Sequence, residues 1–317
     1  MAARAEFGQI VDHCVEISHP EKILFASDGV TKQELVDYYQ RVAPCILPHL
    51  RDRPLAMECY PDGIDRPGFF RKDVPSYFPA WIRTVTIKKK AGGTVRHVVC
   101  DDTASLVYLA NQACITPHAW LSRTDKLEFP DQMMFDLDPS GDEFGAVKAT
   151  ARSLAELLGR LELPRFLKTS GSRGLHVAVP LRRSEGFDSV RAFARKLAEV
   201  VVSQEPAQRT LEQRKSRRHG RVFVDINRNG YAQTAAPAYA VRARAGAPIS
   251  VPLHWHELDD ENLRPDGVTI RTAFDRLEKV GDPWWDFRQH AASLGKARRK
   301  LEKAHVARGI PQEAPAG

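Results

Sequence analysis

Apolar residues recur at helical spacing in four parts of the chain. These stretches cover about 31–42, 104–112, 147–161 and 187–201. The first is introduced by Thr31 and Glu34, which stand at the spacing of a capping box and should begin the helix. Four amphipathic helices with apolar inner faces are therefore expected.

Short apolar or alternating runs predict strands between these helices. The expected strands lie at about 57–60, 84–89, 94–99, 133–138, 175–180, 222–226 and 239–244. Three lysines at 88–90, followed by glycines, indicate the tip of a basic hairpin. Helices and strands are interspersed without a repeat, so the pattern predicts an α+β fold. Residues 1–292 should fold together, and 293–317, poor in apolar residues, should form a basic, flexible tail.

The strand at 133–138 carries two carboxylates on one face. Because side chains alternate across a strand, Met133 should point into the core, whereas Asp136 and Asp138 share the opposite face. Pro139 ends the strand, so the carboxylates should lie at its mouth, where a ligand has room. Two like charges this close repel each other and would have to be neutralised by a cation, an arginine or a lysine. The two carboxylates are close enough to hold one or two divalent ions. For an isolated pair, the alternative is that one carboxylate caps the turn and the other is solvated.

Two further segments carry compatible chemistry. Asp225 interrupts an apolar strand, where burying a carboxylate is costly without a cation or hydrogen bonds. Between the two acidic strands, Ser170, Ser172 and Arg173 lie in a Gly-rich turn whose amides, hydroxyls and guanidinium can cradle a phosphate. His176 begins the strand that follows. A Gly-rich turn alone is a weak signal, but acids, turn and histidine together are much more specific.

Composition places the chain among ordinary globular proteins. Its 317 residues are 43% hydrophobic and 27% charged, enough for one large domain or two. No apolar run approaches the ~20 residues of a membrane span, and the N-terminus has no apolar export signal. Five cysteines without a C-x-x-C pair fit free thiols in a reducing compartment. A cytoplasmic protein without membrane contact is therefore expected.

The net charge of +7 is moderate, so the distribution of basic residues matters more than their sum. One basic run, residues 214–221, leads directly into the strand that carries Asp225. Phosphate contact is expected there. A second run, 296–300, lies near the C-terminus and is interpreted as solvated surface.

The order of the three motifs resembles a known family. Asp-Leu-Asp at 136–138, Ser-Gly-Ser-Arg-Gly-Leu-His at 170–176 and Val-Phe-Val-Asp at 222–225 resemble the motifs of archaeo-eukaryotic primase-polymerases. More narrowly, the chain is similar to the polymerase domain of bacterial ligase D and its stand-alone relatives. Further matching segments extend the resemblance over about 10–288. It implies one catalytic domain in which two β-sheet modules flank the active-site cleft.

The resemblance implies roles for particular residues. The acids that hold two Mn²⁺ or Mg²⁺ ions would be Asp136, Asp138 and Asp225. The incoming nucleotide would be held by His118, Ser170, Ser172, Arg173, His176, Arg218, Arg242 and Arg244. From the residues alone, His118 would be a histidine of a turn or helix end.

Four more residues would contact DNA by the same resemblance. Lys22 and Lys32 would bind the 5′-phosphate of the downstream strand, whereas the residues alone suggest ordinary surface lysines. Phe69 and Phe70 would stack on the template. Adjacent residues of a strand point opposite ways, so the alternative is that at least one phenylalanine is in the core. Neighbouring glycine and basic residues favour an exposed turn.

The implied function is that of a DNA-directed nucleotidyltransferase. It would add nucleotides, preferentially ribonucleotides, to 3′-hydroxyl ends at short gaps and double-strand breaks that carry a 5′-phosphate. Its partners would be gapped or broken DNA, nucleoside triphosphates, an ATP-dependent DNA ligase and Ku, in end joining or excision repair. The 317 residues contain no ligase or nuclease signature, so a stand-alone polymerase or one domain of a longer protein is expected.

Two other classes of function remain open. A phosphatase of the haloacid dehalogenase type also uses two acids on a strand, but it expects Thr or Val where this chain has Ser140. A non-catalytic DNA-end binder would gain nothing from three acids that face phosphates. Primer extension, run beside a generic phosphatase substrate, separates these functions.

Overall fold

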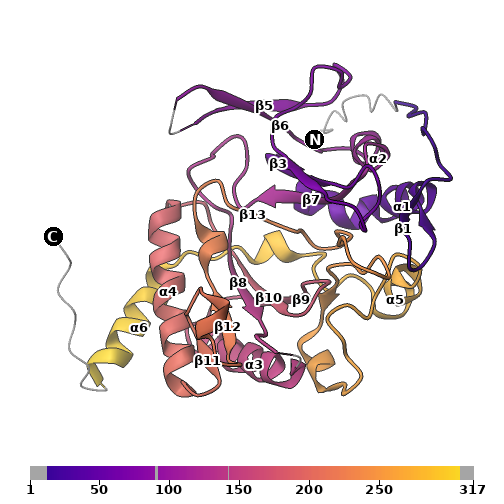
Figure 1. The fold of residues 1–317 in the computed structure, drawn as a ribbon. Coiled ribbons are helices and arrows are strands. Elements are labelled where there is room, and N and C mark those ends of the chain that lie inside the picture. The colour runs from indigo at the N-terminus through magenta and orange to yellow at the C-terminus, as the bar shows by residue number, and fades with distance from the viewer. Residues whose placement is uncertain (1–12, 90–91, 142, 308–317) are drawn as a thin grey trace, which may run out of the picture.

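Six helices and fourteen strands make up the part of the chain that a computed structural model describes, residues 13–89, 92–141 and 143–307 (Figure 1). The helices are α1 (Lys32–Leu50), α2 (Thr103–Asn111), α3 (Phe144–Arg160), α4 (Phe187–Gln204), α5 (Ala273–Val280) and α6 (Gly295–Ala307). The α+β fold is confirmed. None of these helices has both the length and the apolar character needed to cross a bilayer.

The larger sheet has six strands in the order β11-β12-β8-β10-β9-β14. Its strands are β8 (Gln132–Asp138), β9 (Phe166–Thr169), β10 (Leu175–Pro180), β11 (Arg209–Thr210), β12 (Val222–Asp225) and β14 (Pro252–Leu253). Helices α3 and α4 contact this sheet and occupy the lower part of Figure 1 with it. The acidic strand β8 lies between β12 and β10, so all three motifs meet on neighbouring strands.

A second sheet of four strands has the order β13-β7-β3-β4. It consists of β3 (Leu55–Cys59), β4 (Phe69–Arg71), β7 (Cys114–Trp120) and β13 (Thr234–Ala235). Two further pairs are β1 (Ile23–Phe25) with β2 (Val30–Thr31), and the hairpin of β5 (Thr84–Lys88) and β6 (Thr94–Val98). The hairpin is confirmed, but residues 90–91 at its expected tip lie outside the described residues.

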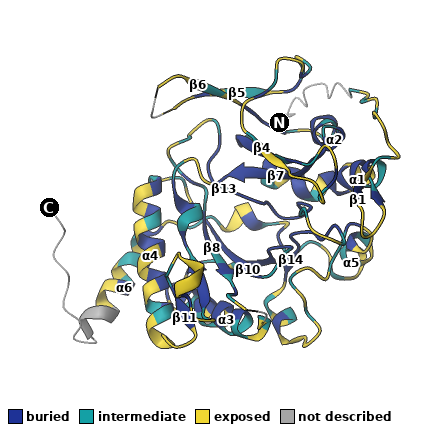
Figure 2. Ribbon diagram, in the orientation of Figure 1, coloured by how far each residue is buried: buried dark blue, intermediate teal, exposed yellow. Residues whose placement is uncertain are grey.

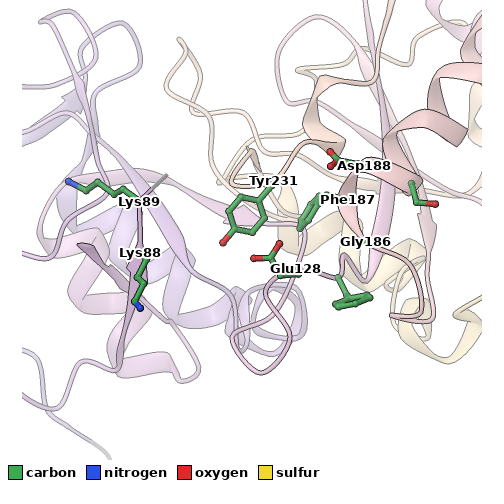
Figure 3. Close-up of a pocket in the computed structure, with 9 residues that line it drawn as sticks. Lys88, Lys89, Glu128, Gly186, Phe187, Asp188 and Tyr231 are labelled. Carbon is green, nitrogen blue, oxygen red and sulfur yellow. The ribbon is translucent and has the colours of Figure 1, made fainter. Parts of the chain in front are cut away.

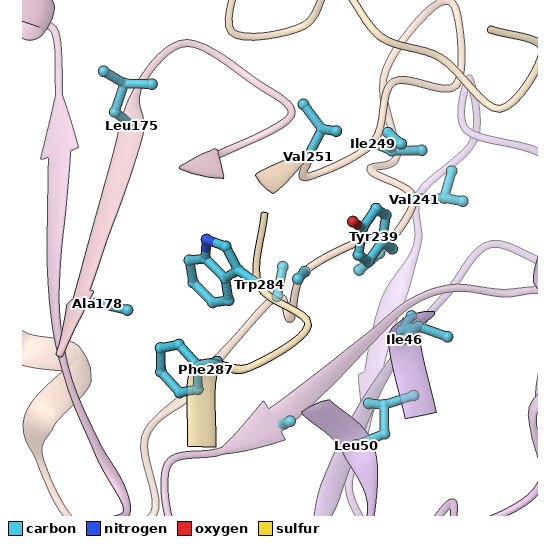
Figure 4. Close-up of a cluster of buried hydrophobic side chains, with 14 of the residues drawn as sticks. Ile46, Leu50, Leu175, Ala178, Tyr239, Val241, Ile249, Val251, Trp284 and Phe287 are labelled. Atoms are coloured by element: carbon cyan, nitrogen blue, oxygen red, sulfur yellow. The ribbon is translucent and has the colours of Figure 1, made fainter. Parts of the chain in front are cut away.

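One continuous hydrophobic core joins the two sheets. Figure 4 shows Leu175 of β10, Trp284 and Tyr239 in the same buried cluster as Ile46 and Leu50 of α1. Figure 2 shows the strands of both sheets largely buried, with exposed residues along the outer face of α4. The buried side chains of this core therefore fix the position of one sheet relative to the other.

Helix α1 begins as predicted but ends later. Thr31 Oγ1 accepts a hydrogen bond from the Glu34 amide, and the Glu34 carboxylate accepts one from the Thr31 amide, which confirms the capping box. The helix continues through Pro44 and Pro48 to Leu50. Proline removes a backbone hydrogen bond, and burial of the apolar face as far as Leu50 offsets that loss.

Two other expectations were wrong. Residues 239–244 form no strand in the described chain beyond a single bridge between Val241 and Ile249. Tyr239 has φ of 67°, which ends an extended run, and its hydroxyl donates to Asp282 at 2.6 Å. The tail expected from 293 is ordered as α6, because Ala297 and Leu301 pack into the core. Residues 308–317 lie outside the described residues.

Candidate active site

A polar cavity of about 280 Å³ lies between the two sheets. Its walls come from β7, β8, the β9–β10 turn and the segments after β12. The lining residues are His118, Asp136, Asp138, Ser170, Ser172, Arg173, His176, Arg228, Ala235, Ala236, Arg242 and Arg244. The cleft between two sheet modules is confirmed, and it gathers most of the residues expected at the nucleotide site.

The carboxylates meet through the register of two antiparallel strands. Asp225 of β12 pairs directly with Asp136 of β8, and Phe223 pairs with Asp138. Directly opposed residues of an antiparallel pair bring their Cβ atoms within about 4.5–5.5 Å. Met133 on the other face of β8 is fully buried, as the alternation predicted. The three acids therefore lie close together on one face of the six-stranded sheet.

Arginines balance the charge of the acids on β8. Arg228 Nε lies 3.8 Å from Asp136, while Arg173 and Arg218 lie 3.9 and 3.7 Å from Asp138. Burial alone would raise the pKa of Asp136, but contact with His176 and Arg228 brings it well below its ordinary value. Asp136 is therefore ionised at neutral pH.

The other two acids respond differently to the same surroundings. Burial and the charge of Asp136 raise the pKa of Asp138. Burial also raises the pKa of Asp225, whose Oδ1 accepts a 2.7 Å hydrogen bond from the Asn227 amide. The negative charge of Asp136 thus raises the pKa of the neighbouring carboxyls, and a cation bound between them would remove this repulsion.

The donor set fits hard divalent cations, because carboxylate oxygens are the ligands that Mg²⁺ and Mn²⁺ prefer. In the part of the chain that the structure describes, no three or more His, Cys, Asp or Glu side chains are already grouped around a common point. To hold an ion, Asp136, Asp138 and Asp225 would have to turn away from their arginine or backbone partners and converge.

The turn between β9 and β10 is built around the hydroxyl of Ser170. Its Oγ accepts hydrogen bonds from the amides of Ser172 and Gly174, at 3.2 and 3.1 Å. Gly171 has φ of 66°, and a Cβ at Gly174 would lie 2.1 Å from the Leu137 carbonyl oxygen, so both positions require glycine. Two amides expected to cradle phosphate are thus used within the turn. The side chains of Ser172 and Arg173 line the cavity beside this turn.

Two further arginines are held rigidly beside this turn. Arg242 donates to the Ser170 carbonyl oxygen at 3.3 Å, and its buried Nε has no hydrogen-bond partner among the described residues. Arg218 donates to the carbonyl oxygens of Glu212 and Gln213 at 3.0 and 2.8 Å, which leaves its third nitrogen facing Asp138. A guanidinium held in this way is preorganised to bind an anion.

His118 lies on strand β7, so its interpretation as a turn or helix-end residue was wrong. Its Nε2 lies 2.9 Å from Glu58 Oε2, and its ring centroid lies 5.1 Å from that of Phe70. Burial lowers the pKa of His118, and the carboxylate of Glu58 opposes that shift only partly. A neutral imidazole beside an aromatic ring offers a flat surface on this wall of the cavity.

The residues expected to contact DNA form two groups, and one of them, Lys32, is buried, so its interpretation as an ordinary surface lysine was wrong. Phe69 and Phe70 of β4 are 40% and 57% exposed, so the alternative that one is in the core was wrong, although they lie in a strand and not a turn. Lys22 and Lys32 are adjacent, joined by a 2.8 Å hydrogen bond between their backbones. Lys22 Nζ lies 3.2 Å from Asp62, whereas Lys32 is buried and donates to the Ser18 carbonyl oxygen.

Three residues of the site were not anticipated. Glu58 forms a hydrogen bond with His118. The other two, Lys168 and Ser250, are buried and hydrogen-bonded to each other, and Lys168 Nζ lies 2.8 Å from His176 Nδ1. Burial and the nearby charge of Lys168 lower the pKa of His176 to about 4. Lys168 precedes the Gly-rich turn directly in the sequence, but its burial depends on strands far apart in the chain.

A second cavity, of about 460 Å³, lies apart from the acids (Figure 3). Lys88 and Lys89 of the hairpin face it from one side, and Phe187 and Asp188 of α4 from the other. None of the acids or arginines of the first cavity lines it. The residues with the chemistry of a phosphate and metal site are therefore those of the cleft between the sheets.

Known proteins share this arrangement. The polymerase domain of Mycobacterium tuberculosis ligase D, solved in complex with DNA, superposes with a TM-score of 0.82 at 30% sequence identity. The match covers 88% of this chain and 99% of that one. The similarity therefore extends over most of this chain.

Sequence relatives are longer proteins. Multifunctional non-homologous end joining proteins LigD from M. tuberculosis and Pseudomonas aeruginosa are 31% and 32% identical, over 87% and 90% of this chain. The bifunctional LigD of Bacillus subtilis is 29% identical. The chain spans only 37%, 34% and 46% of these three relatives. The family model of the LigD primase-polymerase domain matches residues 31–284, and the chain belongs to that family.

Proposed function

We propose that this chain is a DNA-directed nucleotidyltransferase that extends a 3′-hydroxyl end with nucleoside triphosphates. The observation that carries the proposal is that Asp136, Asp138 and Asp225 lie on the same face of neighbouring strands, with Asp136 and Asp138 lining a cleft that also contains four arginines. A phosphatase or a simple DNA binder does not need three acids from two strands beside four cationic side chains.

Each part of the cleft has a task in this reaction. Asp136, Asp138 and Asp225 would hold two divalent ions, Mg²⁺ or Mn²⁺. When bound, such ions would lower the pKa of the 3′-hydroxyl and stabilise the negative charge on the attacking and leaving oxygens. Ser172 and the arginines at 173, 218, 242 and 244 bind the triphosphate and orient its α-phosphate toward the acids.

The opposite wall binds the nucleoside and the template. His118 packs against the incoming nucleotide, supported by Glu58, while the exposed rings of Phe69 and Phe70 stack on template bases. The turn of Ser170 and Ser172 has small polar side chains and no bulky group to exclude a 2′-hydroxyl. We infer that ribonucleotides are used at least as well as deoxyribonucleotides.

The DNA substrate follows from the same surfaces. By the family resemblance, Lys22 and the adjacent Lys32 bind the 5′-phosphate on the far side of a gap, for which Lys22 would have to leave Asp62 and Lys32 would have to leave the Ser18 carbonyl oxygen. The relatives are named for non-homologous end joining. The proposed setting is therefore gap filling at broken or excised DNA, followed by an ATP-dependent ligase, with Ku as the end-binding partner.

The test is primer extension on gapped DNA, with Mn²⁺ or Mg²⁺ and one nucleotide, beside a generic phosphatase substrate. Wild-type protein should extend the primer, use ribonucleotides as well as deoxyribonucleotides and leave the phosphatase substrate intact. Asp136→Ala, Asp138→Ala and Asp225→Ala should each abolish addition while gapped DNA is still bound. Asp125→Asn, at an exposed acid paired with Arg183, is the matched control and should extend normally. Near-normal extension by Asp138→Ala would refute the two-ion assignment.

A further inference from the structure

Lys168 is a fully buried lysine that the proposed reaction does not use. It lies on β9 directly opposite His176 of β10, and its exposed fraction is 0%. Its Nζ lies 2.8 Å from His176 Nδ1 and 2.5 Å from Ser250 Oγ. Burying an amine is costly unless it is hydrogen-bonded. The two partners of Nζ therefore indicate what the buried lysine does.

The hydrogen bonds around this lysine determine where the protons are. Ser250 Oγ donates its proton to the Thr169 carbonyl oxygen at 2.7 Å, so it must accept from Lys168. His176 Nε2 lies 3.3 Å from the carboxylate oxygen Oδ1 of Asp136. A carboxylate oxygen can only accept, so this contact favours the tautomer with the proton on Nε2. In the neutral imidazole, Nδ1 then accepts the hydrogen bond that Lys168 Nζ donates.

We propose that Lys168 is a positioning residue for nucleotide addition, and that it acts through His176. By donating to Nδ1, its Nζ holds the imidazole in the tautomer with the proton on Nε2, and that proton orients Asp136 at the mouth of β8. Burial lowers the pKa of Lys168 well below its ordinary value, and the amine and the ammonium both have N–H groups that can donate to Nδ1. Ser250 anchors Nζ, so the four groups form one chain from the sheet interior to the catalytic wall. The kinetic part of this inference rests on the proposed polymerase function.

Removing the donor at Nζ has a defined consequence. Without Lys168 the imidazole can take the other tautomer, whose Nε2 lone pair would face the carboxylate oxygen of Asp136. The orientation of Asp136 would then be lost although every catalytic side chain is still present. Loss of a hydrogen-bonding group that orients the ligands of a metal site typically lowers activity about 10–100-fold. Lys168→Met keeps an unbranched side chain, one atom shorter, and removes the donor, so it should lower kcat/KM by that factor.

A double-mutant cycle tests whether Lys168 acts through His176. Lys168→Met and His176→Ala are compared singly and together in single-turnover extension of a gapped primer. If the proposal holds, Lys168→Met has little further effect once His176 is absent, because there is no imidazole to orient. Losses that multiply in the double variant would overturn it. If wild-type protein does not extend the primer at all, the proposed function fails instead.

A readout independent of activity is the tautomer of His176. In protein labelled with ¹⁵N-histidine, long-range NMR correlations should show the proton on Nε2 in the wild type and a mixture of tautomers in Lys168→Met. An unchanged tautomer would overturn the proposal. Arg209→Met is the matched control, because Arg209 is an equally buried cation of the same sheet that touches no active-site residue. It should lower stability and leave kcat/KM unchanged.

If Lys168→Met does not fold, Ser250→Ala serves in its place. It removes the anchor of Nζ while the lysine remains, so it should cause a smaller loss that again disappears when His176 is absent. A loss that persists in the His176→Ala background would count against the proposal.

Discussion

Replacing Asp131 with asparagine should destabilise the fold more than any exposed charge substitution. Asp131 Oδ2 accepts hydrogen bonds of 2.7 Å from Arg53 and from Arg123, whose side chains are only 3% and 4% exposed. Arg53 also donates to the Trp120 carbonyl oxygen at 2.9 Å. Because Asp131 directly precedes β8 and Trp120 ends β7, this cluster ties the two sheets that flank the cleft.

The magnitude follows from what the substitution leaves behind. Asparagine has the same shape but no charge, so two buried guanidiniums would face each other without a counterion. Breaking a buried ion pair on one side costs about 3–5 kcal/mol. With an unfolding entropy of about 2.1 cal/mol/K per residue, the 317-residue chain should lose about 4–8 °C in Tm.

The assay is thermal and urea denaturation of wild type and variant between pH 3 and 7. Burial alone would raise the pKa of Asp131, but Arg53 and Arg123 bring it below its ordinary value. A carboxyl whose pKa is lower in the folded state stabilises the fold above its unfolded pKa, about 4, and that contribution is lost as the pH falls. The difference between the two proteins should therefore be constant near neutral pH and shrink below about pH 4.

The matched control is Asp125→Asn. Asp125 bonds both nitrogens of Arg183 at 2.7 and 2.8 Å, but it is 66% exposed. Exposed ion pairs contribute about 0–1 kcal/mol. If Asp131→Asn costs no more than Asp125→Asn, or if its effect does not depend on pH, the reasoning from buried charge is wrong.

Three further predictions concern the substrate surfaces. Phe70→Ala should weaken binding of gapped DNA by about 1–3 kcal/mol in fluorescence anisotropy without lowering Tm, because the ring is 57% exposed; unchanged affinity would remove it from the template path. Lys22→Ala should reduce the preference for 5′-phosphate over 5′-hydroxyl by about 1.5–3 kcal/mol in the same assay, whereas full retention would place the end-recognition site elsewhere. Glu58→Gln removes the carboxylate 2.9 Å from His118 and should raise KM for the nucleotide with little change in kcat; an equal fall in kcat would assign this pair to the chemical step instead.

Several elements could be predicted because their signals are local. Alternation along β8 placed Asp136 and Asp138 on one face, since the side of a strand depends only on the position of a residue within it. The capping box of Thr31 and Glu34 is likewise made within one turn of helix. The resemblance of three short motifs identified the family, and with it the nature of the cleft.

Local rules failed where distant contacts decided the outcome. Residues 239–244 have the alternation of a strand, but the hydroxyl of Tyr239 bonds to Asp282 and its backbone takes a positive φ. Proline inside α1 is a signal to stop a helix, and burial of the apolar face, which packs against α2 and β7, overrides it. The low apolar content after residue 293 indicated a tail, but Ala297 and Leu301 suffice to dock α6.

By itself, then, the sequence determined which residues have the side chains that the proposed chemistry needs, the side of each strand on which the acids lie and the family to which the chain belongs. Only the tertiary structure decided which of them meet. The register of β8 with β12 brings Asp225 opposite Asp136, and that of β9 with β10 places Lys168 behind His176. The physical reason is that side-chain direction repeats every two residues, whereas register between strands is set by packing across the entire core.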